Sequence, residues 1–294
     1  MRRSEPDLNL SHASAASLAP PRLVPGTGRL PLLLSVPHAG RAYPDWLVRL
    51  SRRGHDSLRP LEDPLVDRLV WRAQALGLAC VIADAPRAAI DCNRAEDELD
   101  PAVISLPPGI GHDGWRVRAG LGLIPGRLAA GGELWRRRIG PAELEARLET
   151  AWRPYHRLLS EQLVLLHRSH AEVLLLDCHS MPWRAGQAEL VIGDRHGTTA
   201  APFLTDIIRS TAQAEGYRVA CNDPYAGGHI VASHGAPAQG IHAIQLELDR
   251  RCYLDSAGKS LGRDFDRAAR LLQLIAEAAG KALLDRRPLP LAAE

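Results

Sequence analysis

The stretch Val173-Leu-Leu-Leu-Asp-Cys-His-Ser-Met-Pro182 is an apolar run of strand length that ends in Asp177, His179 and a proline. Open α/β sheets bind ligands at the carboxyl ends of their strands, so a histidine that emerges there is well placed for chemistry. Pro31-Leu-Leu-Leu-Ser-Val-Pro-His38-Ala-Gly40 repeats this arrangement earlier in the chain. Because neutral imidazole is the commonest metal ligand, two histidines converging on one sheet edge make a zinc site the first hypothesis.

Composition narrows the class of protein. The 294 residues are enough for one large α/β domain with a substantial core. The 36 basic and 34 acidic residues nearly balance, which disfavours nucleic-acid and acidic-membrane partners and favours a small-molecule one. The five cysteines contain no Cys-x-x-Cys pair, and no apolar run is long enough for a membrane span. The N-terminus has acidic and polar residues where a signal peptide would carry its apolar core. We therefore expect a cytoplasmic protein with reduced thiols, as a monomer or small homo-oligomer.

The order of helical and strand patterns predicts the fold class. Residues 1–20 lack a clear period and end at a Pro-Pro pair, so we expect a flexible N-terminal arm followed by a single α/β domain over 21–294. Apolar residues at helical spacing predict a helix from Pro64 to Gly77, and Leu78–Ala83 reads as the next strand. This alternation predicts a mixed, mostly parallel central sheet flanked by helices.

The same patterns predict the remaining elements. They are a long loop over Pro101–Gly132, a helical block over Pro141–His170 interrupted at Pro154, strands at Glu189–Ile192, Tyr217–Cys221 and Ala243–Leu248, and helices from about Ala200 to Gly216 and from Gly258 to about Leu283. Loops as long as the first of these are often functional.

Two carboxylates near these elements each have a structural alternative. Asp63 directly precedes a helix with proline at its first position, and on these residues alone a capping role is favoured. Glu247 lies in an apolar strand, where a carboxylate is costly unless it has a partner or a function. Its partner would be Arg250 or Arg251, and its function would be that of a general base in a zinc enzyme.

A polar cluster follows the strand Leu78–Ala83 and contains Arg87, Asp91, Asn93 and Arg94. Arginine binds carboxylates through paired hydrogen bonds, so the cluster suits an acidic substrate, although a capped turn would have the same sequence. The glycines of Gly120–Gly126 do not have the spacing of a nucleotide-binding loop, so no nucleotide is expected.

Together these segments resemble the N-formylglutamate amidohydrolase family, within the wider zinc carboxypeptidase and aspartoacylase-like group, from about Leu32 to Asp255. The matching stretches are Ser35-Val-Pro-His38-Ala-Gly40, Glu62-Asp63-Pro-Leu-Val-Asp67, Pro86-Arg87-Ala-Ala-Ile-Asp91-Cys-Asn93-Arg94, Gly120-Leu-Gly-Leu-Ile-Pro125, Pro154-Tyr-His156, Asp177-Cys-His179-Ser180, Gly193-Asp-Arg195, Gly227-Gly-His229-Ile230 and His242-Ala-Ile-Gln-Leu-Glu247-Leu248. Their common order and spacing are more specific than any one stretch.

The resemblance implies a zinc-peptidase type of fold and a set of residue roles. It implies hydrolysis of an N-acyl amino acid, above all N-formyl-L-glutamate, with Zn²⁺ or another divalent metal as cofactor. The implied roles are His38, Asp63 and His179 as metal ligands, Glu247 as general base, Arg87 as the group that polarises the scissile carbonyl, and Asn93, Arg94 and His229 as substrate-binding residues. Asp91 and Asp177 are expected to orient the ligands, Asp177 because it lies two residues before His179 and projects to the same face of the strand. On this reading Asp63 is a ligand and not a helix cap.

Two departures from the family pattern leave alternatives open. Arg41 occupies the position where the wider zinc-peptidase group has a glutamate ligand, so the carboxylate ligand has to come from Asp63. Val231-Ala232-Ser233 replaces the Thr-Arg-His associated with formylglutamate hydrolysis, so another N-acyl amino acid remains an alternative substrate. A non-catalytic protein that binds zinc or an acidic ligand, and a metal-independent regulatory domain, are the remaining alternatives.

Overall fold

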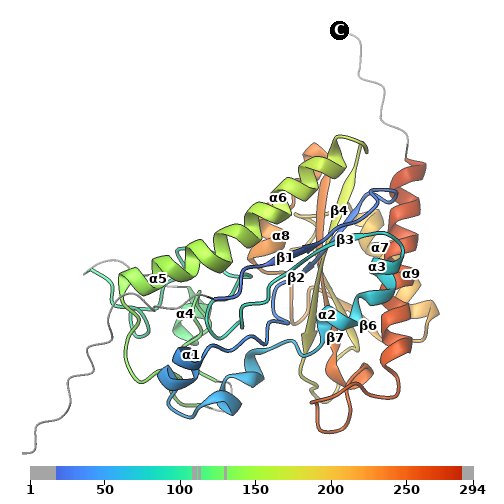
Figure 1. Ribbon diagram of the computed structural model, residues 1–294. Coiled ribbons are helices and arrows are strands. Elements are labelled where there is room, and N and C mark those ends of the chain that lie inside the picture. Colours follow the sequence, from blue (N-terminus) through green and yellow to red (C-terminus); the bar gives the residue numbers. More distant parts are fainter. Residues whose placement is uncertain (1–17, 108–110, 112–113, 129–130, 287–294) are drawn as a thin grey trace, which may run out of the picture.

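The computed structural model describes residues 18–107, 111, 114–128 and 131–286, and its centre is a sheet with helices on both faces (Figure 1). In these residues the sheet has seven strands in the order β1-β3-β2-β4-β7-β5-β6. The strands are β1 (Arg22–Val24), β2 (Leu32–Val36), β3 (Ala79–Ile82), β4 (Val173–Met181), β5 (Leu190–Gly193), β6 (Val219–Cys221) and β7 (Ile241–Asp249). The central strands β3, β2, β4 and β7 are parallel, whereas β1 and β5 run antiparallel to β3 and β7. The predicted mixed, mostly parallel sheet is confirmed.

Strand β4 is the centre of this sheet and is buried along its whole length. A strand covered on both faces reads as a nearly continuous apolar run, which explains the Leu174–Leu176 sequence. The parallel pairing aligns Ser35 of β2 with Asp177, and Glu247 of β7 with His179. The carboxyl ends of neighbouring strands therefore carry polar residues to the same edge of the sheet.

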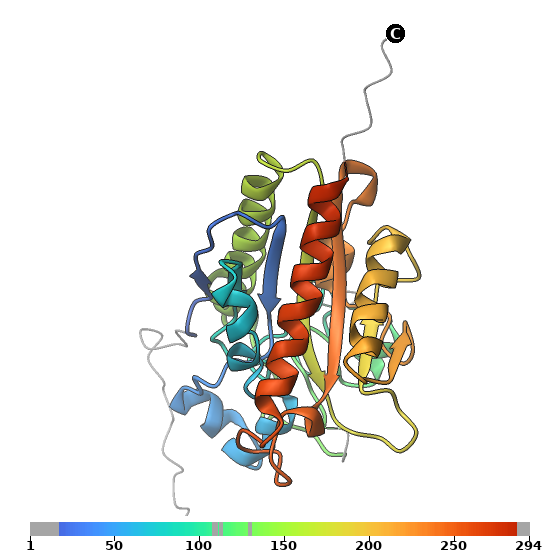
Figure 2. The same cartoon turned by 90° about the vertical axis from the view of Figure 1, so that its right-hand side faces the viewer.

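Helices cover the two faces of the sheet. On one face lie α3 (Trp71–Ala75), α7 (Pro202–Ala214) and the long α9 (Phe265–Asp285), which Figure 2 shows running along the sheet. On the other face lie α6 (Arg153–His167) and α8 (His229–His234). Each helix contributes apolar side chains to the core on its own face, such as Ile275 of α9 and Leu159 of α6.

A third cluster of apolar residues lies beyond the carboxyl ends of β2 and β3. It includes side chains of α1 (Asp45–Leu50), α5 (Pro141–Arg147) and the segments on either side of α4 (Trp115–Arg118). Figure 1 shows α1 and α4 at the lower left of the sheet. The short 3₁₀ turns η1 (His55–Ser57) and η2 (Arg59–Leu61) belong to the same region. This layer supports the loops that follow β2 and β3.

The helix predicted from Pro64 to Gly77 is wrong in its extent. The chain forms two short helices, α2 (Val66–Leu69) and α3, and Leu65 before them has the left-handed backbone conformation with φ 61°. This conformation is rare for a non-glycine residue and is incompatible with a helix that starts at Pro64. The Tyr253 hydroxyl donates to the Pro64 carbonyl over 2.7 Å and fixes the turn.

Other boundaries differ from the sequence pattern. Pro154 does not interrupt the helical block. A π-helical turn, η3 (Leu148–Trp152), links α5 directly to α6. Pro154 lies in the first turn of α6, where its missing N–H is tolerated. Helix α9 begins at Phe265 rather than near Gly258.

Strand β1 and helices α1 and α8 were not predicted. They are only three to six residues long, and so short a segment has little periodicity.

Three expectations concern the chain as a whole. Residues 1–17 of the predicted N-terminal arm lie outside the described residues, and Leu18 is buried in the third apolar cluster. All five cysteines are free thiols, as predicted. Within the described ranges, no helix combines the length and apolar character that crossing a bilayer requires.

Candidate metal centre

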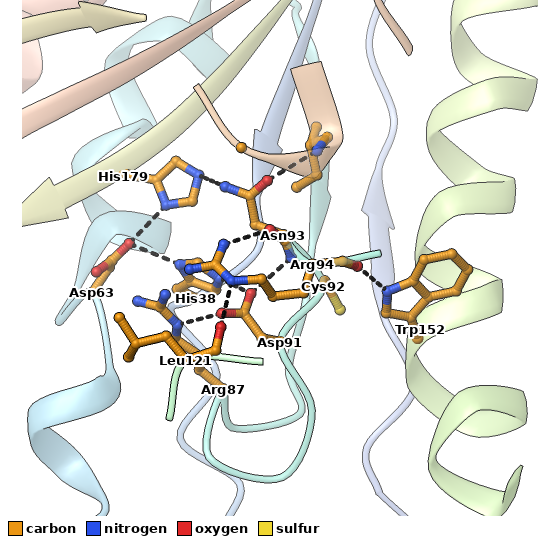
Figure 3. Close-up of polar contacts among 12 residues, drawn as sticks. His38, Asp63, Arg87, Asp91, Cys92, Asn93, Arg94, Leu121, Trp152 and His179 are labelled. Atoms are coloured by element: carbon orange, nitrogen blue, oxygen red, sulfur yellow. Dashed lines mark hydrogen bonds and ion pairs between the residues drawn. The ribbon is translucent and has the colours of Figure 1, made fainter. Parts of the chain in front are cut away.

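Three buried side chains meet at the carboxyl end of the parallel strands (Figure 3). His179 comes from β4, His38 from the loop after β2, and Asp63 from the segment before α2. Nδ1 of His38 lies 3.2 Å and Nδ1 of His179 lies 2.9 Å from the same Asp63 oxygen, Oδ2. The donor atoms of all three residues lie within 4.8 Å of one another. The structure therefore brings the predicted ligand set together, and Asp63 does not cap a helix.

Close backbone packing fixes the loop that carries His38. The backbone N–H of Asp63 donates to the His38 carbonyl over 2.9 Å. A Cβ at Gly40 would lie 2.1 Å from the Ala85 carbonyl oxygen, which is less than any real contact. Only glycine fits where the loop after β2 crosses the loop after β3, so the Pro-His-Ala-Gly sequence has a steric reason.

Each ligand histidine also contacts a second carboxylate through its other ring nitrogen. Nε2 of His38 lies 2.7 Å from Asp91, and Nε2 of His179 lies 2.9 Å from Asp177. Asp177 in turn accepts a 2.7 Å hydrogen bond from Ser35. Metal-bound histidines in proteins usually donate their free N–H to such a carboxylate, which fixes the tautomer and the ring orientation. With Nε2–H donating outward, the lone pair of each Nδ1 faces Asp63.

This donor set fits a divalent cation. Two Nδ1 lone pairs and a carboxylate oxygen face the same point, an arrangement that is repulsive without a positive charge between them. Burial raises the pKa of Asp63, but its close contacts with the His179 and His38 imidazoles outweigh burial and hold that pKa well below its usual value. Burial likewise raises the pKa of Asp91, and Arg87 and His38 lower it well below its usual value. Both carboxylates thus stay ionised around the centre.

Glu247 lies beside His179 on the neighbouring strand and is 8% exposed. Its carboxylate accepts a 2.8 Å hydrogen bond from Gln245. The ion pairs considered for it are not formed in the structure, because Arg250 pairs with Asp63 and Arg251 pairs with Asp249. Burial is the main reason that the pKa of Glu247 is raised to about 7, and nearby His179 opposes the rise. A carboxyl group with such a pKa is suited to exchange protons near neutral pH.

Arg87 and Arg94 flank the centre in different ways. Arg87 donates through Nε to Asp91 over 2.8 Å and is partly exposed. Arg94 is 8% exposed, and its Nε and Nη1 each donate over 2.7 Å to the carbonyls of Leu121 and Asn93 (Figure 3). Burial lowers the pKa of Arg94 more than the charge of Asp91 raises it, and the charges of Arg87 and Arg116 lower it further. An anion bound beside Arg94 would favour its charged form.

Asn93 is held by the protein itself. Its side-chain oxygen accepts a 2.9 Å hydrogen bond from the Ile230 backbone N–H. Its amide nitrogen lies 3.2 Å from both the Gln245 side-chain oxygen and Nε2 of His179. Through these contacts, Asn93 links the backbone at the start of α8 to the predicted metal ligand His179. The role of Asn93 in substrate binding stays a prediction.

His229 begins α8 and lies within a group of rings that the sequence analysis did not recognise. Its ring centroid is 5.8 Å from that of Trp152 and 5.3 Å from that of His156. Trp152 donates to the Arg94 carbonyl and His156 contacts the Cys92 carbonyl, each over 2.9 Å. Trp152, at the end of η3, and His156, in α6, thus contact the backbone on either side of Asn93.

A partial signal for this group existed in the sequence. Pro154-Tyr-His156 belongs to the resembling stretches, but no chemical role followed from it. Arg250 was considered only as a partner of Glu247, and Gln245 was not singled out. Their contacts depend on β7 lying next to β4, which no local pattern determines.

The comparisons with known proteins agree with this geometry. A family model described as N-formylglutamate amidohydrolase matches residues 30–254. The chain belongs to the N-formylglutamate amidohydrolase family. Every predicted site residue, from His38 to Glu247, lies inside the matched range.

Individual relatives support the same assignment. N-formylglutamate deformylases from Pseudomonas putida and Pseudomonas aeruginosa are 33% and 32% identical over 241 residues, which are 78% of this chain and 83% and 84% of theirs. The crystal structure of N-formylglutamate amidohydrolase from Ralstonia eutropha has a TM-score of 0.83 at 32% identity, covering 91% of this chain and 99% of that one. A protein from Agrobacterium tumefaciens shares the fold with a TM-score of 0.65 at 18% identity, over 90% of this chain and 95% of that one.

Proposed function

We propose that this chain is a metal-dependent amidohydrolase that cleaves an N-acyl amino acid, with N-formyl-L-glutamate as its preferred substrate. The observation that carries the proposal is the position of Glu247 beside a two-histidine, one-aspartate site. Three protein ligands are typical of a catalytic zinc site, because they leave a position for water or substrate. The names of the Pseudomonas and Ralstonia relatives support the choice of substrate.

The bound ion would be Zn²⁺ or another divalent metal held by His38, Asp63 and His179. Such an ion lowers the pKa of a bound water and polarises a carbonyl oxygen. Asp91 and Asp177 would keep the two imidazoles in the tautomer that presents Nδ1, through the contacts described above. Asp/His sites accept several divalent ions, so the identity of the native ion is a matter for experiment.

Glu247 and Arg87 would carry out the proton transfers and the charge stabilisation of the reaction. Glu247 accepts a proton from the attacking water as the water oxygen bonds to the formyl carbon. Arg87, whose Nε is held by Asp91, has its terminal N–H groups left to stabilise the developing oxyanion. As the carbon–nitrogen bond breaks, Glu247 returns the proton to the departing nitrogen, and formate and glutamate are the products.

Recognition of the amino-acid part would fall to Arg94, with His229 beside it. Arg94 uses Nε and Nη1 for backbone carbonyls, which fixes the guanidinium plane and directs Nη2 away from those bonds. A fixed guanidinium loses little entropy when it binds a carboxylate. Val231 lies buried in α8, and Ser233 contacts the His229 ring, so the departure from the family pattern lies next to this region.

The direct test is hydrolysis of N-formyl-L-glutamate by purified protein, with formate and glutamate both quantified. The assay compares metal-loaded protein with protein treated with a chelator, and a panel of N-formyl and N-acetyl amino acids is run beside it. We expect turnover only with metal present and the highest kcat/KM for N-formyl-L-glutamate. A higher kcat/KM for another member of the panel would change the substrate. Metal binding without turnover of any member would instead favour the non-catalytic binding protein.

A further inference from the structure

We propose that Arg250 is a positioning residue of the metal centre, which holds one oxygen of Asp63 so that the carboxylate presents only its other oxygen to the two imidazoles. The inference rests on the proposed metal site. It concerns a residue with no ligand role of its own.

Arg250 reaches this position from the end of β7. It is the first residue of the 3₁₀ turn η5 (Arg250–Cys252), three residues after Glu247. Its Nη2 donates to Oδ1 of Asp63 over 3.2 Å and to the Glu62 carbonyl, and its Nε donates to the Ser180 hydroxyl over 3.3 Å. One guanidinium thus contacts Asp63 and the residues adjacent to both Asp63 and His179.

The segment that carries Asp63 depends on such contacts. Asp63 lies between η2 and α2, outside any helix or strand. Besides its backbone bond to His38, the segment is held by the turn after β7, through Arg250 and through the Tyr253 hydroxyl on Pro64. Among the described residues, Arg250 supplies the only side-chain hydrogen bond to Oδ1. Without it, only the contacts of Oδ2 with the two histidines would oppose rotation of the Asp63 carboxylate about its last side-chain bond.

The division of the two oxygens has a chemical consequence. Oδ2 of Asp63 faces the Nδ1 atoms of both histidines, while Oδ1 accepts a hydrogen bond from the Arg250 guanidinium, whose side chain is 20% exposed. Two imidazole nitrogens and one carboxylate oxygen make three protein donors, which is the number that leaves room for water and a substrate carbonyl. If both Asp63 oxygens faced the ion, the second oxygen would occupy a coordination position that water or the substrate carbonyl needs. Arg250 therefore acts on coordination through Asp63.

The test uses Arg250→Met, which removes the hydrogen bonds and roughly preserves side-chain length. Arg251→Met is the matched control, because Arg251 belongs to the same turn but pairs with Asp249 and is half exposed. The measurements are the metal dissociation constant, by competition with a chromophoric chelator, and the absorption spectrum of the Co²⁺-loaded protein, which reports coordination number. Changes in residues that orient metal ligands typically weaken metal affinity by about 10-fold to 100-fold.

We expect Arg250→Met to weaken binding by about that factor and to change the Co²⁺ spectrum. Arg251→Met should change neither. Wild-type affinity and spectrum in folded Arg250→Met protein would overturn the inference and leave the proposed function intact. If the Met variant does not fold, Arg250→Gln replaces it with the same expectation and the same refuting outcome. A wild-type protein that binds no divalent ion would instead overturn the proposed function.

Discussion

Arg250 and Asp63 are joined by a 3.2 Å contact from Nη2 to Oδ1, while the opposite oxygen of the same carboxylate contacts both ligand histidines. The aspartate thereby links two parts of the chain that lie 187 residues apart. Because Glu247 precedes Arg250 by only three residues, β7 and the turn that follows it supply both a carboxylate beside the centre and a side chain that contacts Asp63.

Replacing Asp63 by asparagine should remove most metal binding. The amide keeps the volume but is a weaker ligand and carries no charge, so the two imidazoles lose their anionic partner. Metal content after dialysis, measured by atomic spectrometry, should fall well below one equivalent, and hydrolysis should fall with it. Asp67→Asn is the matched control, because Asp67 lies four residues away and pairs with Arg41. Full metal content in Asp63→Asn would show that the ligands are assigned wrongly.

Arg87 and Arg94 should affect different kinetic constants. Arg94→Ala should mainly raise KM for acidic substrates, since a contact to a substrate carboxylate is the same in the ground state and the transition state. Arg87→Ala should mainly lower kcat, because its terminal N–H groups are assigned to the oxyanion. Steady-state kinetics of both variants with N-formyl-L-glutamate decide the point. If both changes alter KM alone, neither residue contacts the developing charge.

Stability should fall as the pH is lowered below neutrality, partly because of His156. Burial lowers the pKa of His156 from 6.5 to about 3, and His234, 3.0 Å away, adds to the effect. The unfolded chain therefore binds more protons than the folded chain between these two pH values, so the free energy of unfolding decreases as the pH falls through that window. Each such group contributes up to about 1.4 kcal/mol per pH unit.

Urea unfolding of metal-free protein at pH 7 and pH 5.5 measures this effect. His156→Gln removes the titrating group, and titration of the other residues largely cancels in the comparison with wild type. The variant should lose less stability between the two pH values than wild type does. An equal loss in both proteins would mean that folding does not lower the pKa of His156.

The sequence predicted much of the central sheet because buried parallel strands have a strong apolar signal. The runs before His38 and His179 are strands, and the alternation with helices indicated a parallel sheet. Asp63 was ambiguous, because a residue before Pro64 reads as a cap until the fold shows that Leu65 is left-handed and the helix starts later. The family resemblance, and not local pattern, placed Asp63 with the histidines.

Other parts of the site depend on contacts between distant segments. The support of Asn93 by Trp152 and His156 requires α6 to pack beside the loop after β3. The contact of Arg250 with Asp63 requires the turn after β7 to reach the segment before α2. Periodicity describes one element at a time, so it carries no information on such pairs.

The last prediction concerns Glu247, whose position distinguishes an enzyme from a binding protein. Glu247→Gln keeps the side-chain volume and its capacity to accept the Gln245 hydrogen bond through the amide oxygen. The amide does not accept a proton from water, so kcat should fall by about 10²-fold to 10⁴-fold, the usual contribution of a general base. Metal content and the urea midpoint should stay near those of wild type, because Glu247 is not among the three donors that share the centre.

Two other outcomes would each identify a different role for Glu247. Near-normal turnover with bound metal would show that another group accepts the proton, and the raised pKa of Glu247, which burial mainly causes, would then have no part in catalysis. Loss of metal together with activity would make Glu247 a fourth ligand. The Co²⁺ spectrum separates the second case from a simple loss of the base, because removing the base alone leaves the coordination unchanged whereas removing a ligand alters it, and kcat separates the first.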